Sequence, residues 1–356
     1  MKSTKRVLLF IDQLGSGGAE RQLTYLAIGL KRAGYDVRLV RFYPGEVFYE
    51  ADLREAGIEA EICLKGRSPL KRPFAVAGLV RDWKPDAVIA YLDGTAMGCC
   101  LARMLTKFNL IVSERNTTQN LSIKERIKFI LYRVANHVVP NSFSQGEFVK
   151  KTFPRLSSKV EVITNMVNLE KFRPASIRPS SQRVLTTARI APQKNVHNYL
   201  RALAILKAEG VKANFDWFGA PSSQEYLDSV LELRTKLGLE NFIEFHIGGT
   251  KNVAEEYRAS THFCLPSSFE GFANVLCEAM ACGLVCTASR VSDNPYILSD
   301  DALCFNPDDV ADIAAKIKSS LIMNESQQME AASVNRRRIE ELCSSESFVD
   351  HYISLI

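Results

Sequence analysis

Long apolar runs are absent from this chain of 356 residues. No segment approaches the roughly 18 consecutive apolar residues that a membrane-spanning helix requires. The apolar run after the first basic residues, Val7 to Ile11, is also too short for the core of a secretory signal peptide. The sequence therefore predicts a globular protein that stays in the cytoplasm.

Residue patterns that bind metal ions are missing as well. The sequence contains no Asp-x-Asp motif, and its nine cysteines include no Cys-x-x-Cys pair. The five histidines are scattered without the spacing of metal ligands. We expect no bound metal, and we interpret the cysteines as small buried side chains in a reducing compartment.

Charge is distributed unevenly, although the net charge is only +5. Lys and Arg outnumber Asp and Glu in the first half, and they concentrate in residues 65–84 and 122–138. The second of these segments has apolar residues at helical spacing, which is typical of helices that lie on anionic membranes. A solvated basic face over an ordinary core stripe explains the same pattern and remains open. Nucleic-acid binding is not expected, because the charge excess is small and no aromatic-basic motif is present.

Length and periodicity together predict two α/β domains. The chain exceeds the usual size of a single core, and β-rich runs alternate with helical runs as in a parallel sheet. The clearest helices are expected at 19–33 and 196–209. Strands are expected at 6–11, 37–42, 87–91, 110–113, 138–140, 160–163, 183–188, 214–218, 243–246, 262–265 and 284–287.

A linker rich in Pro, Ser and Arg at residues 172–182 marks the domain boundary. The expected fold is two doubly wound, Rossmann-like α/β domains that face one another, residues 1–172 and 173–335. Ligands of such sheets bind outside the carboxyl ends of the strands. We therefore expect the site in the cleft between the two domains.

The first candidate motif is a glycine-rich stretch at residues 14–20, directly after the first expected strand. Gly17 and Gly18 stand at a helix start, where backbone approaches a ligand closely. The stretch is not a dinucleotide-binding fingerprint, because the last glycine of G-x-G-x-x-G, counted from Gly15, is replaced by Glu20. This replacement argues against an oxidoreductase.

The second candidate motif follows the first expected strand of the second domain. Arg189 and Lys194 are five residues apart and flank a proline turn that leads into a helix. A planar guanidinium and a flexible ammonium at this spacing are suited to gripping a pyrophosphate.

The third candidate motif, residues 266–283, carries two carboxylates eight residues apart. Glu270 lies in a glycine-containing turn, and Glu278 lies in the helix that Asn274 or its neighbours would open. The N–H groups of a first helical turn attract phosphate or sugar oxygens. The pattern indicates a site for an anionic, hydroxyl-rich ligand, although a surface helix that happens to start with Glu-Gly-Phe explains it equally well.

In this order and at these separations, the three motifs resemble the retaining glycosyltransferases of family 4, which have the GT-B architecture. The resemblance covers nearly the whole chain. It implies metal-independent transfer of a hexose, with retention of configuration, from a nucleotide-diphosphate sugar, and a UDP-sugar is the expected donor. It implies no cofactor and no covalent nucleophile, because the leaving phosphate helps to deprotonate the acceptor. Residues 336–356 would form a terminal helix that crosses back to the first domain.

The resemblance also assigns roles to the motifs. Arg189 and Lys194 would hold the diphosphate and offset the charge that develops on the leaving nucleotide, and with Glu270 they form the expected catalytic set. Glu278 would accept hydrogen bonds from the ribose hydroxyls. The expected donor-binding residues are Gly17, Gly18, Arg189, Lys194, Glu270, Gly271, Phe272, Ala273, Asn274, Val275 and Glu278.

The chain departs from the family pattern after the strand at 110–113. The family often has a histidine there that reaches the donor sugar, whereas this sequence has Glu114 and Arg115. We take both as candidate sugar contacts, with Arg115 as a hydrogen-bond donor that cannot act as a neutral acid or base. Asp93, just after the strand at 87–91, is a candidate acceptor contact, and a helix cap explains it as well.

The size, the Ser-Glu-Arg-Asn stretch and the basic first domain are similar to those of bacterial enzymes that extend a polyprenyl-diphosphate-linked or capsular saccharide. The partners would then be a nucleotide sugar, a lipid-linked or oligosaccharide acceptor, and the anionic inner face of the membrane. Candidate contacts to the membrane or to the lipid diphosphate are Lys71, Arg72, Lys124 and Lys128.

Two other functions stay open. A nucleotide-sugar epimerase of the same architecture would bind the same diphosphate and ribose, but it requires an additional acid–base set that the sequence does not reveal. A non-catalytic module that binds sugar nucleotides or a membrane surface would bind the donor without turnover.

Overall fold

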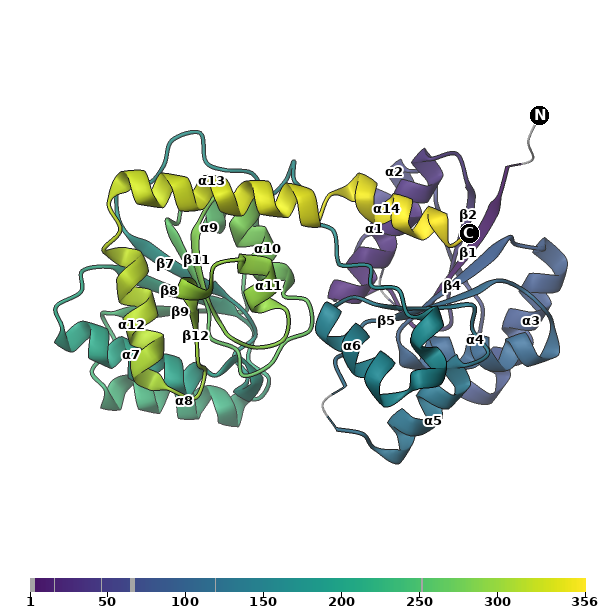
Figure 1. Cartoon of the computed structure of the whole chain (residues 1–356), viewed down its shortest axis with the longest axis horizontal. Helices are drawn as coiled ribbons and strands as arrows, with labels where there is room; N and C mark the ends of the chain where they lie inside the picture. The colour runs from purple at the N-terminus through teal and green to yellow at the C-terminus, as the bar shows by residue number, and fades with distance from the viewer. Residues whose placement is uncertain (1–3, 16, 46, 65–67, 119, 251) are drawn as a thin grey trace. The chain divides into compact units, whose positions relative to one another are not determined.

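The chain folds into two compact units. The computed structural model describes residues 4–15, 17–45, 47–64, 68–118, 120–250 and 252–356. The first unit comprises Met1–Met166 with Ser345–Ile356, and the second comprises Val167–Ser344. Each unit contains one six-stranded parallel sheet covered by helices on both faces (Figure 1).

The sheet of the first unit has the strand order β3-β2-β1-β4-β5-β6. Its strands are buried on both faces, which explains why they appear in the sequence as continuous apolar runs. In β1, for example, Leu8 and Phe10 belong to one core and Val7 and Leu9 to the other. The strands are β1 (Arg6–Ile11), β2 (Asp36–Arg41), β3 (Ala60–Ile62), β4 (Ala87–Tyr91), β5 (Leu110–Glu114) and β6 (His137–Pro140).

Helices of the first unit form two layers. One core includes residues of α3, α4, α5 and α6, and the other includes residues of α1 and the C-terminal α14. Helix α14 lies beside α1 (Figure 1), where Gly29 leaves room for Val349. The helices are α1 (Gly18–Arg32), α2 (Glu50–Glu55), α3 (Arg72–Trp83), α4 (Asp93–Leu105), α5 (Ile123–Tyr132), α6 (Phe143–Thr152) and α14 (Ser345–Ser354), with 3-10 turns η1 (Pro69–Lys71) and η2 (Pro154–Lys159).

The sheet of the second unit repeats this topology with the order β12-β11-β10-β7-β8-β9. Helices α7, α8 and α12 contribute to the core on one face, and α9, α10, α11 and α13 contribute to the core on the other. The strands are β7 (Arg183–Thr187), β8 (Asn214–Gly219), β9 (Ile243–Ile247), β10 (His262–Leu265), β11 (Val285–Ser289) and β12 (Cys304–Phe305). The helices are α7 (Val196–Ala208), α8 (Gln224–Lys236), α9 (Val253–Arg258), α10 (Asn274–Ala281), α11 (Asn294–Leu298), α12 (Val310–Leu321) and α13 (Glu325–Leu342), with η3 (Pro192–Lys194) and η4 (Asp301–Leu303).

The division between the units differs from the predicted domain ends. Val167 and Phe172 pack into the core of the second unit, and the N–H of Val167 donates to the carbonyl of Cys343 at 3.0 Å. Helix α13 continues through residue 336 with Ile339 buried in the same core, so the segment that joins the first unit begins only at Ser345.

The predicted two-domain Rossmann-like α/β fold is confirmed, with one predicted strand absent and two short strands added. Residues 160–163 run beside β6 through two backbone hydrogen bonds but form only an isolated bridge at Val160. The short strands β3 and β12 were not predicted, because segments of two or three residues show no periodicity. Among the described residues, no helix combines the length and the apolar character needed to cross a bilayer.

Candidate functional site

Both sheets have a topological switch point. The first strand of each unit, β1 or β7, lies beside the fourth, β4 or β10, and the remaining strands continue outward in opposite directions. Ligands of doubly wound sheets bind where the loops at the carboxyl ends of such a pair diverge. In the second unit, the Arg189–Lys194 motif follows β7 and the Glu270 turn follows β10, so the fold brings these two motifs to one switch point.

Lys194 and Glu270 form an ion pair at this switch point of the second unit. The Lys194 ammonium contacts Oε1 of Glu270, and both side chains are largely buried. The hydroxyl of Ser267 donates to the same carboxylate oxygen at 2.6 Å, and the hydroxyl of Ser292 donates to the Glu270 carbonyl at 2.5 Å. Glu270 is therefore held from both its side chain and its backbone, and it fixes the ammonium of Lys194.

The two loops that carry this pair are joined to each other. The Gln193 side-chain amide donates to the carbonyl of Phe269 at 3.0 Å, and the N–H of Ser268 donates to the Gln193 carbonyl at 2.9 Å. The Arg189–Lys194 motif and the Glu270 turn consequently form one structural element, although they are separated by more than 70 residues in the sequence.

Arg189 is the cation of the motif that remains accessible. It follows β7 directly, and the next residue, Ile190, pairs with the backbone of Ala220 at 2.9 Å. The Arg189 side chain is exposed and takes part in no ion pair of the described part of the chain. An exposed guanidinium on the same loop as a fixed ammonium is suited to a diphosphate.

Helix α10 begins at Asn274, as the sequence predicted, and carries Glu278 in its interior. Glu278 is only 3% exposed, and the hydroxyl of Tyr257 lies 3.4 Å from its Oε2. Phe272 and Ala273 are buried in the core of the second unit, so their side chains anchor the helix start and leave its backbone to face a ligand. Gly271, Asn274 and Val275 are half-buried at the same turn.

The glycine-rich turn of the first unit is a helix start, as predicted. Gly17 is the N-cap residue of α1 and Gly18 is its first residue. A side chain at Gly17 would meet the carboxylate of Glu20, so the carboxylate lies close to the backbone of this turn. Ser16 of this turn lies outside the described residues.

Arg72 does not lie on the surface, which corrects its expected role as a membrane contact. It is 7% exposed, its Nη2 lies 3.1 Å from Oδ1 of Asp12, and its Nε donates to the hydroxyl of Tyr43 at 3.1 Å. Thr95 of α4 donates to the same Asp12 oxygen at 2.7 Å. Arg72 therefore positions Asp12, a carboxylate at the β1–β4 switch point that we had not predicted as a site residue.

Lys128 is also buried, and its expected membrane contact is wrong for the same reason. It is 1% exposed, and three carboxylates surround its ammonium. The distances from Nζ are 2.6 Å to Glu125, 3.1 Å to Glu114 and 3.5 Å to Asp93. One ammonium compensates only one negative charge, so the cluster would carry excess negative charge if all three carboxylates were ionised.

Glu114 is the member of this cluster that is deepest in the protein. It has no exposed surface, so its expected contact with a sugar is not supported by the structure. Burial and the neighbouring charge of Asp93 together outweigh Lys128 and raise the pKa of Glu114 to about 8. At neutral pH the carboxyl of Glu114 therefore holds a proton for most of the time.

Asp93 and Glu125 are the members of the cluster that reach the surface, and Asp93 lies just after β4. Its side chain is 18% exposed, and it occupies the first position of α4. The preceding residue, Leu92, has a left-handed φ of 72°, a strained conformation for a residue with a branched side chain. Strain of this kind is concentrated at functional sites, so Asp93 remains the acceptor candidate of the first unit.

Arg115 is committed to internal contacts, which corrects its expected role as a sugar contact. Its guanidinium donates to Ser113 at 2.7 Å, to Asn165 at 2.8 Å and to the hydroxyls of Tyr91 and Tyr352. Since Tyr352 belongs to α14, Arg115 ties the C-terminal helix to the sheet of the first unit.

Lys71 and Lys124 are exposed, in agreement with a surface role. Residues 65–67, which begin the first basic segment, lie outside the described residues. Lys124 lies on α5, which also carries the exposed apolar side chains of Ile123, Ile127 and Ile130.

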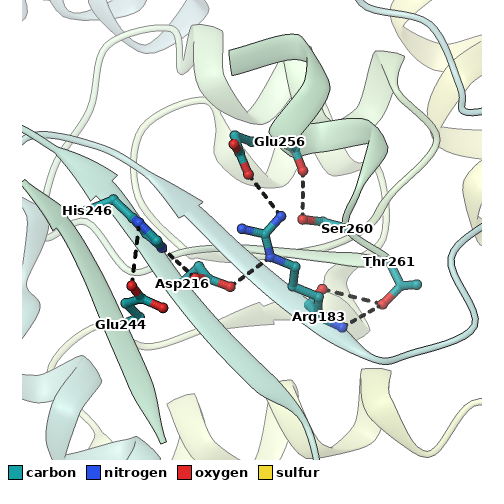
Figure 2. Close-up of polar contacts among 7 residues, drawn as sticks. All are labelled: Arg183, Asp216, Glu244, His246, Glu256, Ser260 and Thr261. Atoms are coloured by element: carbon teal, nitrogen blue, oxygen red, sulfur yellow. Dashed lines mark hydrogen bonds and ion pairs between the residues drawn. The ribbon is translucent and has the colours of Figure 1, made fainter. Parts of the chain in front are cut away.

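A separate polar cluster on the sheet of the second unit contains a histidine with acidic partners, which sequence spacing did not indicate. Figure 2 shows Asp216 between Arg183 and His246, at 2.7 Å and 2.6 Å, with Glu244 3.9 Å from His246. Asp216, Glu244 and His246 are side chains of the types that ligate metal ions. However, Arg183 already shares the Asp216 carboxylate, and hydrogen bonds from Arg183 and His246 lower the pKa of Asp216 against the effect of burial. An added cation would therefore have to compete with Arg183 for the Asp216 carboxylate.

Two doubly wound units, each with polar loops at its switch point, define a protein of the GT-B architecture. Residues 16–171 match the model of Glycosyltransferase Family 4, and residues 168–337 match that of Glycosyl transferases group 1. The chain thus belongs to the family 4-like glycosyltransferases, as the three motifs had indicated.

Individual proteins agree with this assignment. A Campylobacter jejuni GalNAc-alpha-(1->4)-GalNAc-alpha-(1->3)-diNAcBac-PP-undecaprenol alpha-1,4-N-acetyl-D-galactosaminyltransferase is 28% identical over 90% of this chain and 89% of its own length. The fold is shared with a glycosyltransferase from Rickettsia africae, with a TM-score of 0.85 and 17% identity over 99% of this chain and 98% of that one. It is also shared with Anabaena HepE in complex with UDP and glucose, with a TM-score of 0.82 and 18% identity over 98% of each chain.

Proposed function

We propose that this glycosyltransferase moves a sugar from a nucleotide-diphosphate sugar to a lipid-linked saccharide, with retention of configuration and without a metal ion. The observation that carries the proposal is the switch point of the second unit. There the loop with accessible Arg189 and the fixed ammonium of Lys194 is joined to the Glu270 turn, which leads into α10. A donor diphosphate is the ligand whose charge and shape this arrangement fits.

The chemistry assigned to this chain is stabilisation of the leaving group. Negative charge grows on the diphosphate as the bond from the sugar carbon to the phosphate oxygen breaks, and preorganised cations lower the energy of that state. Glu270 contributes by holding Lys194 in place before the donor arrives, so little reorganisation is needed. The N-terminus of α10 adds its partial positive charge on the same side.

Glu278 is proposed to select the nucleoside part of the donor. A carboxylate accepts two hydrogen bonds from neighbouring ribose hydroxyls, and Glu278 lies one helical turn inside α10, beneath the Glu270 turn. Glu278 is only 3% exposed, and its contact with the Tyr257 hydroxyl, at 3.4 Å, is long for a hydrogen bond. We propose that a bound ribose replaces this contact.

The acceptor part of the proposal rests on similarity and on the first unit. The Campylobacter relative is named for action on an undecaprenol-diphosphate-linked saccharide. Asp93 is proposed to accept a hydrogen bond from the attacking hydroxyl, because Lys128 holds it at the β1–β4 switch point with part of its carboxylate accessible. Deprotonation would be completed by the leaving phosphate.

The donor assignment is tested by titrating the chain with UDP-, GDP- and ADP-sugars in the presence of a chelator. We expect binding to one donor and slow release of its nucleotide, with both lost in Arg189→Ala and in Glu278→Ala. Donor binding that is unchanged in both variants would contradict the site. Appearance of an epimeric sugar nucleotide would favour the epimerase, and binding without any turnover in the presence of a lipid-linked acceptor would favour the non-catalytic module.

We also propose that the protein binds the membrane surface through the outer side of α3, α4 and α5. These three helices cover the same face of the first sheet. Burial of apolar side chains in the headgroup region would add to electrostatic attraction by exposed Lys71 and Lys124. The exposed apolar residues of this layer are Leu70, Phe74, Leu101, Met104, Leu105, Ile123, Ile127 and Ile130.

Ile123→Ser combined with Ile127→Ser is expected to reduce binding to vesicles that contain anionic lipid by about tenfold or more, because each isoleucine contributes about 1.5–3 kcal/mol when buried. Co-sedimentation measures this. Ile177→Ser combined with Ile322→Ser is the matched control, since both residues are exposed in the second unit. Equal loss in the control pair, or no loss in the α5 pair, would contradict the membrane-facing assignment of α5.

A further inference from the structure

A cavity of about 460 Å³ opens on the second unit, away from its switch point. It lies between the segment 174–179, the end of α10 and helix α13. Thr261, which precedes β10, and Gly283, which precedes β11, also line it. The cavity is therefore at the amino ends of strands whose carboxyl ends carry the donor motif. Its volume is typical of a site for a small molecule.

Four arginines line this cavity: Arg178, Arg258, Arg336 and Arg337. Two of them have carboxylate partners. Arg258 pairs with Glu255, and Arg336 lies 2.6 Å from Glu340 while donating to the carbonyls of Phe172 and Ala281. These two arginines hold the walls of the cavity together, and their charge is balanced.

The other two arginines have no carboxylate at ion-pairing distance among the described residues. Arg178 donates from Nη2 to the neutral side chain of Gln328 at 3.0 Å and forms no ion pair with a described residue. Burial lowers the pKa of Arg178, with Glu325 opposing the change in part. Arg337 is exposed and likewise has no ion-pair partner among the residues described. Two guanidinium groups without an ion-pair partner in the described part of the chain thus line one cavity.

The rest of the cavity is largely apolar. Pro174, Pro179, Met329 and Ala332 contribute apolar surface. Gly283 adopts φ +74°, and a Cβ there would come within 3.5 Å of Pro174 and 3.8 Å of Ala332, so the walls approach closely at this end. A ligand that fits both the two arginines and the apolar walls carries about two negative charges at one end and apolar atoms at the other.

We propose that this cavity binds a phosphorylated small molecule with an apolar moiety, whose phosphate is held by Arg178 and Arg337 and whose apolar part lies against Met329 and Ala332. Arg–phosphate pairs are bidentate and strong, and a phosphate monoester supplies the matching charge. The site does not depend on the proposed transfer reaction, because it shares no residue with the donor motif.

The test is calorimetric titration of the full chain carrying Arg189→Ala and Lys194→Ala, so that the donor motif does not contribute phosphate binding. The probes are inorganic pyrophosphate, phenyl phosphate and dihexanoyl phosphatidate below its micellar concentration. We expect saturable binding at one site per chain, at least about fivefold tighter for a probe with an apolar part than for pyrophosphate. Tighter binding of phenyl phosphate would indicate a soluble ligand, and tighter binding of the phosphatidate would indicate a lipid headgroup.

Arg178→Gln combined with Arg337→Gln is expected to weaken this binding at least about tenfold. Arg201→Gln combined with Lys236→Gln removes the same charge from α7 and α8 of the same unit and is expected to leave the affinity unchanged. Ala332→Phe fills the cavity without changing charge and is expected to abolish binding. The proposal would be overturned by absence of saturable binding, by equal loss in the two charge variants, or by affinity for both apolar probes no higher than for pyrophosphate.

Discussion

Replacement of Lys194 by methionine is expected to lower kcat/KM for glycosyl transfer by about 10²- to 10³-fold, the range found when one group that stabilises a developing oxyanion is removed. The ammonium is fixed by Glu270 beside the start of α10, so it acts without reorganisation when the diphosphate leaves. Most of the loss should fall on kcat, because charge on the diphosphate is greater in the transition state than in the bound donor. Initial rates of nucleotide release at varied donor concentration measure both parameters.

A second variant separates a structural effect of this substitution from a catalytic one. Lys194→Met leaves Glu270 partly buried without its cation, which itself destabilises the fold. Lys194→Met combined with Glu270→Gln removes both charges and should recover most of the thermal stability while activity stays low. Lys212→Met, at an exposed position of the same unit, should change neither. Recovery of activity together with stability in the double variant would show that Lys194 has only a structural role.

Much of the fold was predictable because buried parallel strands carry an unambiguous signal. The apolar runs at β1, β4 and β10 gave strands whose ends agree with the structure. The start of α10 at Asn274 was predictable for a related reason, since a glycine-containing turn before an amphipathic run marks a helix N-terminus. The ends of the two units were less predictable, because Val167 and Phe172 join the second core through contacts with α13, more than 160 residues further along the chain.

The candidate site was predictable where one short motif contains both the charged side chains and the backbone N–H groups that would bind a ligand. It was less predictable where the position of a charged side chain depends on partners elsewhere in the chain. The pairing of Lys194 with Glu270 follows from strand order, which the sequence does not state. Arg72 and Lys128 stand in basic stretches and look like surface residues, yet Asp12 and Glu114 turn them inward. Asp12 was the missed residue with an available signal, because it is the first polar residue after β1, as Asp93 is after β4.

Replacement of Lys128 by methionine is expected to destabilise the first unit by about 3–5 kcal/mol, the cost of removing one partner from a buried ion pair. The side chain is 1% exposed, and its loss would leave Asp93, Glu114 and Glu125 close together without a cation. Hydrogen exchange of the β4 and β5 amides at increasing urea measures the opening free energy of this unit. Lys150→Met is the matched control, because that lysine lies on α6 at the surface. A loss below about 1 kcal/mol would contradict the cluster as described.

Glu114→Gln should act in the opposite direction, and its effect should depend on pH. With a pKa of about 8 in the folded protein against an ordinary value of 4.5, Glu114 binds a proton in the folded state that it has lost in the unfolded state. Between these two values stability therefore falls as pH rises, with a contribution of up to about 1.4 kcal/mol per pH unit. Glu114→Gln removes this contribution, so its advantage over the wild type should grow from pH 5 to pH 8 and then level off, and it should partly rescue Lys128→Met. Glu147→Gln, at an exposed position, should run parallel to the wild type. Parallel profiles for Glu114→Gln and the wild type would show instead that Lys128 keeps Glu114 ionised throughout, and that the excess negative charge is carried by Asp93 and Glu125 nearer the surface.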